Sequence, residues 1–126
     1  MLKALVVEDE EDIKQLLLEE LEDKGYQVLE AGNGEIALQR VSEEIPDIIS
    51  ADVFMPVMDG LDLIMRLKEN PETSGIPVVM VTVMNARATE AKARELVVEH
   101  YLTKPWEPGE LDLILDQAMK SGARSR

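Results

Sequence analysis

Residues 77–83 read Pro-Val-Val-Met-Val-Thr-Val, and residues 47–51 read Asp-Ile-Ile-Ser-Ala. Nearly continuous apolar runs of this length are typical of strands buried on both faces, and such strands occur mainly in parallel sheets. Three further runs of strand length lie at residues 2–7, 27–31 and 101–103. We therefore predict five strands, with those at 47–51 and 77–83 in the middle of one sheet.

Segments with helical periodicity separate these strands. Apolar positions three and four residues apart indicate helices at Ile13, Leu16, Leu17 and Leu21; at Ile36, Ala37 and Val41, after Asn33 as N-cap; at Leu61, Ile64, Met65 and Lys68, after the turn Asp59-Gly60; and at Leu111, Ile114, Leu115, Ala118 and Met119. A weaker helical pattern covers residues 86–98. Strands that alternate with helices predict an α/β fold of the flavodoxin-like (βα)5 type, with a parallel sheet in the order 2-1-3-4-5 and helices on both faces.

Length and composition limit the classes of function. The chain has 126 residues, enough for one domain, and we assign residues 1–120 to it. Residues 121–126 are basic and are either a frayed end, the start of a linker or a sequence added for expression. Since 26 acidic residues stand against 13 basic ones, the net charge is -13, and direct binding of nucleic acid is not expected.

The absence of cysteine excludes disulfides, thiol nucleophiles and thiolate metal sites. No apolar run approaches the length of a membrane span, and the chain becomes acidic at Glu8, too early for a signal peptide. These features predict a cytoplasmic protein that makes no membrane contact.

Charged and hydroxyl side chains lie at the carboxyl ends of four predicted strands. They are Glu8 and Asp9, Asp52, Thr82 and Lys104. The ligand crevice of an open parallel sheet lies beyond these strand ends, so we expect the five side chains to converge.

Crowded carboxylates raise one another's pKa unless a cation neutralises them, so Glu8, Asp9 and Asp52 together imply either a shared proton or a hard divalent ion. Mg²⁺ suits this set better than Ca²⁺ because it needs fewer protein ligands and leaves room for phosphate oxygens. Aspartate can also attack phosphorus to form an aspartyl phosphate, and Lys104 and Thr82 would supply a positive charge and a donor.

These residues lie in motifs that closely resemble the receiver domain of two-component response regulators, over essentially the whole chain. The motifs are residues 5–10 (Leu-Val-Val-Glu-Asp-Glu), 46–60 (from Pro-Asp-Ile-Ile-Ser-Ala-Asp to Met-Asp-Gly), 78–82 (Val-Val-Met-Val-Thr) and 101–105 (Tyr-Leu-Thr-Lys-Pro). The resemblance implies that Asp52 is the phosphoacceptor. It also implies that Asp9 binds Mg²⁺ directly, that Glu8 acts mostly through water, and that the backbone carbonyl of Phe54 completes the protein's share of the ligands.

The resemblance further implies a switch. Thr82 and Lys104 match the hydroxyl and the ammonium that sense the phosphoryl group, and Tyr101 matches the aromatic side chain that changes rotamer on activation. The face built from the fourth helix, fifth strand and fifth helix would then be remodelled. The Lys104-Pro105 bond matches one that is often cis in this family.

Partners follow from the same resemblance. The donor would be a sensor histidine kinase or a histidine phosphotransfer protein, the downstream effector is not specified, and a dimer that forms on phosphorylation is compatible with the sequence. The last helix lacks the arginines of the dimer face in many DNA-binding regulators, which disfavours that subgroup. The domain is expected to be regulatory, with no enzymatic role beyond self-phosphorylation and autodephosphorylation.

Two other functions are compatible with parts of the pattern. A pseudo-receiver would use the fold for protein contacts without phosphorylation, although the complete set of acceptor residues argues against it. A phosphohydrolase of the haloacid dehalogenase type also forms an aspartyl phosphate, but it requires a second acid two residues beyond the nucleophile, and Phe54 occupies that position.

Overall fold

The computed structural model describes the backbone of residues 1–83 and 100–125 and the side chains of residues 1–81 and 100–120. The elements in chain order are β1 (Lys3–Val7), α1 (Glu11–Asp23), β2 (Gln27–Ala31), α2 (Gly34–Glu43), β3 (Ile48–Ala51), α3 (Gly60–Glu69), β4 (Val78–Val83), β5 (His100–Lys104) and α5 (Glu110–Ser125). The helix predicted at residues 86–98 lies outside the described residues. Because α5 continues to Ser125, it extends into the predicted tail.

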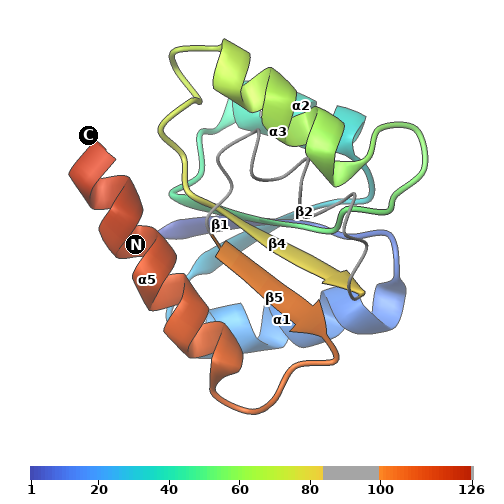
Figure 1. Ribbon diagram of the computed structural model, residues 1–126, viewed down its shortest axis with the longest axis vertical. Helices are drawn as coiled ribbons and strands as arrows, with labels where there is room; N and C mark the ends of the chain where they lie inside the picture. Colours follow the sequence, from blue (N-terminus) through green and yellow to red (C-terminus); the bar gives the residue numbers. More distant parts are fainter. Residues whose placement is uncertain (84–99, 126) are drawn as a thin grey trace.

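The strands form one parallel sheet in the order β2-β1-β3-β4-β5, which confirms the predicted fold (Figure 1). Val7 is in register with both Ala31 of β2 and Ala51 of β3. The carboxyl ends of these three strands are therefore level. Across the other half of the sheet, Val83 of β4 is in register with Lys104 of β5.

Alternate residues of the central strands point to two separate parts of the core. On one face, Val6 and Val79 pack with Leu17 of α1 and Leu115 of α5. The opposite face of the sheet belongs to a second cluster that includes residues of α2 and α3. Figure 1 shows the same layers, with α1 and α5 on one side of the sheet and α2 and α3 on the other. Helices on both faces explain why the central strands are apolar at nearly every position.

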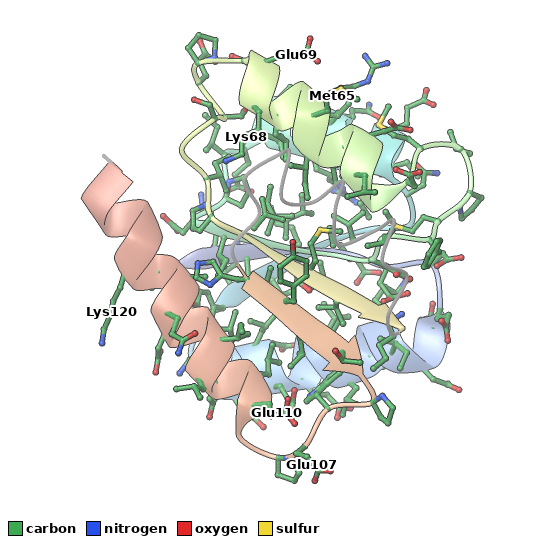
Figure 2. All side chains as sticks on the ribbon, viewed as in Figure 1. Met65, Lys68, Glu69, Glu107, Glu110 and Lys120 are labelled. Carbon is green, nitrogen blue, oxygen red and sulfur yellow. The ribbon has the colours of Figure 1, made fainter. Side chains whose placement is uncertain are left out.

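The four helices form where their periodic patterns predicted them, but several positions of those patterns are not buried. Leu16, Ile36 and Met65 are 44%, 41% and 37% exposed, and Lys68 is exposed as well. Figure 2 shows Met65 and Glu69 on the side of α3 that faces away from the sheet. The buried stripes instead include three leucines that the predicted stripes omitted, which are Leu18, Leu63 and Leu67. Successive residues of a helix are 100° apart, so apolar residues on either side of a core position can face the sheet. The sequence did not show which of these two neighbouring faces would do so.

The predicted N-cap of α2 is confirmed. Asn33 Oδ1 accepts a hydrogen bond of 2.9 Å from the backbone N–H of Ile36. Asp59 caps α3 in the same way, accepting 2.8 Å from the backbone N–H of Asp62. Each cap satisfies an amide of the first helical turn, so both helices begin at a defined residue. Within the described residues, no helix has both the length and the apolar character needed to cross a bilayer.

Candidate functional site

Three of the predicted site residues meet at the carboxyl edge of the sheet. The backbone ladder continues one residue beyond β1 and β3, since the N–H of Glu8 donates to the Ala31 carbonyl and that of Asp52 to the Val7 carbonyl, each at 3.0 Å. These bonds fix both acids directly at the strand ends. Lys104 arrives as the last residue of β5. All three side chains are buried.

The ammonium of Lys104 holds this group of acids together. Its Nζ lies 2.9 Å from Glu8 Oε1 and 3.1 Å from Asp52 Oδ2. Burial lowers the pKa of Lys104, but its interactions with Glu8 and Asp52 outweigh burial and leave that pKa raised. The lysine is therefore a permanent cation, and without it two buried carboxylates would lack a counter-charge.

Glu8 is the strongly perturbed acid of the site. Burial raises its pKa to about 7, and the negative charge of Asp52 adds to the increase while Lys104 opposes it. Near neutral pH, Glu8 is therefore partly protonated, whereas an ordinary glutamate is ionised. A divalent cation beside it would favour the ionised form.

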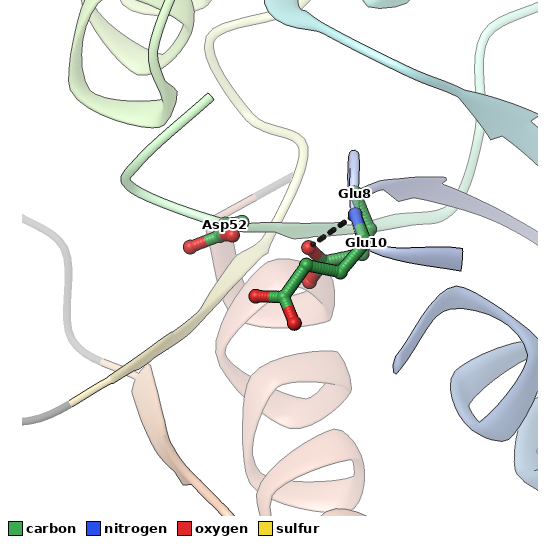
Figure 3. Close-up of side chains that lie close together, drawn as sticks. All are labelled: Glu8, Glu10 and Asp52. Carbon is green, nitrogen blue, oxygen red and sulfur yellow. Dashed lines mark hydrogen bonds between the residues drawn. The ribbon is translucent and has the colours of Figure 1, made fainter. Parts of the chain in front are cut away.

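Glu10 is a site residue that the sequence analysis did not identify. One oxygen from each of Glu8, Glu10 and Asp52 lies within 4.8 Å of the other two (Figure 3). Glu10 is the N-cap residue of α1, yet its side chain makes no capping hydrogen bond; Glu10 Oε1 instead lies 3.5 Å from Lys104 Nζ. Its backbone is extended after a bend at Asp9, and its N–H donates 3.2 Å to Glu8 Oε2, which holds the two acids side by side. The spacing of Glu8 and Glu10 was the available signal.

Asp9 points elsewhere in this arrangement. Its side chain is exposed, and it does not belong to the group of three carboxylates. Its assignment as a direct Mg²⁺ ligand stays a prediction. The same holds for the carbonyl of Phe54, whose backbone N–H donates 3.2 Å to Asp52 Oδ1 and whose side chain is exposed.

The two predicted switch residues lie on neighbouring strands. Thr82 is in register with Thr103, but its side chain lies outside the described part of the chain. Tyr101 is half-buried and packs against the small cluster of Val53, Ile64 and Met80. This position next to the Asp52 loop is compatible with a switch, and the roles of both residues stay predictions.

Two glycines position the loop that carries Asp52. The N–H of Gly60 donates 2.9 Å to the Val53 carbonyl, and a Cβ at Gly60 would overlap the backbone oxygen of Asp52. Gly34 donates 3.1 Å to the Met58 carbonyl, and a Cβ there would lie 2.8 Å from that oxygen. Between them, Val57 has a φ of 70°, a left-handed conformation that is unfavourable for a β-branched residue. The loop is therefore held in place from both sides.

The donor set fits a hard divalent cation. Three carboxylates share one ammonium, so the cluster carries excess negative charge when Glu8 is ionised. Mg²⁺ is bound through one or two carboxylates with several waters, and the remaining positions accept phosphate oxygens. Glu8, Glu10 and Asp52 could hold such an ion on the side of the cluster open to solvent, where Glu10 lies.

Comparison with known proteins gives a consistent result. Residues 4–116 match the family model described as the response regulator receiver domain. The chain is 37% identical over 110 residues to the alkaline phosphatase synthesis transcriptional regulatory protein PhoP of Bacillus subtilis, covering 87% of this chain and 45% of the relative. It is 36% identical over 109 residues to the phosphate regulon transcriptional regulatory protein PhoB of Escherichia coli, covering 86% of this chain and 48% of the relative.

Among solved structures, chemotaxis protein CheY4 of Vibrio cholerae is similar, with a TM-score of 0.87 and 29% identity over 94% of this chain and 98% of that chain. The chain thus spans slightly less than half the length of the two curated relatives described above, but nearly all of this receiver-sized structure.

Proposed function

The chain belongs to the response regulator receiver domain family of two-component signalling, and on that premise we propose that Asp52 accepts the phosphoryl group that switches it. The observation that carries the proposal is the contact of 3.1 Å between the buried Asp52 Oδ2 and Lys104 Nζ. Asp52 directly follows β3 and Lys104 ends β5, so the fold itself brings acceptor and cation together. The family is regulatory, and the chain's role is a response to phosphorylation.

The residues around Asp52 suit phosphoryl transfer. This reaction depends on positioning and on neutralising charge more than on acid-base chemistry. Lys104 can neutralise part of the phosphoryl charge once its contact with Asp52 is exchanged for one with a phosphoryl oxygen. The backbone N–H of Phe54, which now donates to Asp52 Oδ1, holds the other carboxylate oxygen in place.

We propose Mg²⁺ as the cofactor, held by Asp52 together with Glu8, Glu10, Asp9 or the Phe54 carbonyl. When bound, the ion supplies positive charge for the phosphoryl oxygens. The chain's own contribution is to keep two acids buried beside one lysine, so that an added cation is favoured electrostatically.

The switch follows from the change in charge. A phosphoryl group adds about -1.5 to -2 charges and strong acceptor oxygens at residue 52. Thr82 and Lys104 would reorganise to meet them, and Tyr101 would follow because it packs beside the same loop. Remodelling of the surface around β5 and α5 would then transmit the signal.

The partners are proposed from the family. A sensor histidine kinase or a histidine phosphotransfer protein would supply the phosphoryl group. Two relatives are named transcriptional regulatory proteins, but this chain matches less than half of each of them. The effector that reads the switch is therefore left open.

Intact-mass measurement tests this function. Acetyl phosphate and Mg²⁺ should add the mass of one phosphoryl group to the protein, Asp52→Asn should abolish the addition, and Asp59→Asn, in the same loop, should retain it. Asparagine can still cap α3 at residue 59, so this control keeps the fold.

Two results would contradict the proposal. A wild-type protein that gains no mass would be a pseudo-receiver. Sustained hydrolysis of p-nitrophenyl phosphate that Asp52→Asn removes would indicate a phosphohydrolase instead.

A further inference from the structure

We propose that Glu10 selects among phosphoryl donors: its carboxylate favours donors whose leaving atom is a cationic nitrogen over donors whose leaving group departs as an anion. The inference rests on the proposed function of Asp52 and concerns which small or protein-bound donors that residue accepts. Donors of the favoured class include phosphoramidate and a protonated phosphohistidine. Acyl phosphates such as acetyl phosphate belong to the disfavoured class.

The position of Glu10 distinguishes it from the other two carboxylates. The Glu10 side chain is 60% exposed, whereas those of Glu8 and Asp52 are 0% and 5% exposed. A donor that approaches from solvent therefore meets the charge of Glu10 at the mouth of the site. Figure 3 shows its carboxylate turned toward the other two acids.

Glu10 is also the least neutralised of the three acids. Lys104 Nζ is 3.5 Å from Glu10 Oε1 but only 2.9 Å from Glu8 Oε1 and 3.1 Å from Asp52 Oδ2. The amides at the start of α1 do not compensate, because the side chain makes no capping hydrogen bond. When Asp52 holds Mg²⁺ together with Glu8, Asp9 or the Phe54 carbonyl, the negative charge of Glu10 is thus available to act on a bound donor.

The two donor classes differ in the charge on the leaving group. With phosphoramidate, the bond from Asp52 Oδ to phosphorus forms as the P–N bond breaks, and the nitrogen takes the electron pair and leaves as neutral ammonia. It carries partial positive charge until the bond is broken, and Glu10 attracts it. With acetyl phosphate, the P–O bond breaks and the departing acetate gains negative charge, which Glu10 repels.

The expected size of the effect of Glu10 on the rate constants follows from the exposure of its side chain. Interactions of exposed charges a few ångströms apart are about 1 kcal/mol or less, which corresponds to a factor of about five in a rate constant. They are weakened by salt, because the screening length falls from about 10 Å at 0.1 M to about 3 Å at 1 M ionic strength. Donor selectivity should therefore depend on ionic strength.

The test compares second-order rate constants for phosphorylation by phosphoramidate and by acetyl phosphate at saturating Mg²⁺. Glu10→Gln keeps the shape of the side chain and removes the charge. It should shift the ratio of the two constants about fivefold toward acetyl phosphate, and Glu10→Ala should do the same. Asp12→Asn removes an equal charge from the first turn of α1, outside the cluster, and should shift the ratio by less than about twofold.

Two further measurements extend the test, and the first does not depend on phosphoryl transfer. Calorimetric titration without donor should show about threefold weaker Mg²⁺ binding in Glu10→Gln, since one negative charge near the ion is lost. In the wild type, raising the salt concentration should move the donor ratio toward that of the variant.

The possible failures are distinguishable. If the wild type is phosphorylated at residue 52 but both Glu10 variants keep its donor ratio, this inference is overturned and the proposed function stands. If neither donor modifies residue 52 of the wild type, both fail together.

Discussion

Glu8 and Asp52 are buried acids that share one lysine, and the effect of this arrangement on the stability of the folded state depends on pH. Because the pKa of Glu8 is about 7 in the folded protein and 4.5 ordinarily, the folded state holds a proton between these pH values that the unfolded state has lost. The protonated folded state is favoured at the lower pH, so this residue's contribution to stability decreases as pH rises from about 4.5 to about 7.

We predict that Glu8 lowers the free energy of unfolding by about 3 kcal/mol between about pH 5 and about pH 8 in Mg²⁺-free buffer. Urea unfolding at a series of pH values measures this change, and comparison with Glu8→Gln isolates it from the other acids. The variant should lose less stability over this range than the wild type. Equal losses would show that Glu8 does not titrate in this range.

Gly60 is a second residue whose role is set by its surroundings. Alanine at this position would press its Cβ against the backbone oxygen of Asp52, and a backbone neighbour cannot move aside as a side chain can. We predict that Gly60→Ala lowers the free energy of unfolding by about 3 kcal/mol, as overpacking of a tight contact does. Chemical denaturation measures the loss.

Gly75→Ala is the matched control, because a Cβ there meets no atom within 4 Å. It should change stability by less than about 1 kcal/mol. Similar losses in the two variants would contradict the close contact at Gly60.

At the scale of elements, the segment between β5 and α5 is attached to α1. The indole N–H of Trp106 donates 3.0 Å to Glu20 Oε2, and the Trp106 ring packs against the core cluster that α1 and α5 share. Lys24, at the end of α1, lies 3.2 Å from Asp116 Oδ1 of α5. These contacts connect the chain that follows Lys104 to the helix that follows Glu10.

We predict that Trp106→Phe destabilises the fold by about 2 kcal/mol, since it removes a hydrogen bond to a carboxylate and part of a half-buried ring. Glu20→Gln keeps an acceptor and should cost less, while the exposed Glu19→Gln should change stability by less than about 0.5 kcal/mol. Thermal unfolding of the three variants gives the order of their stabilities. If Trp106→Phe changed stability no more than Glu19→Gln, the contacts of Trp106 with α1 would not stabilise the fold.

The elements themselves were largely predictable. The limits of the strand at residues 27–31 agree with the prediction, and those of the other four strands differ by no more than one residue at either end. The agreement is close because apolar runs bounded by acidic residues, Gly or Pro define a strand locally. The exposed positions Leu16 and Met65 were not predictable, since the choice between neighbouring helix faces depends on how the helix lies on the sheet. Packing of that kind is not encoded in a single segment.

At the scale of the whole molecule, the convergence of Glu8, Asp52 and Lys104 was predictable from parallel topology alone. Glu10 was missed because its place in the site depends on the bend at Asp9 and on the hydrogen bond from its N–H to Glu8 Oε2. The Asp9 side chain is exposed at a bend of the chain between these two acids.

The central claim is that residue 52 carries the phosphoryl group, and reduction of the acyl phosphate followed by peptide mapping tests it most directly. Protein treated with phosphoramidate and Mg²⁺ is reduced with borohydride, which converts a phosphorylated aspartate to homoserine, and the peptides are sequenced by mass spectrometry. We predict homoserine at position 52 alone. Homoserine at position 9 or 59 with unmodified Asp52, or no homoserine at all in protein that has gained a phosphoryl group, would contradict the account.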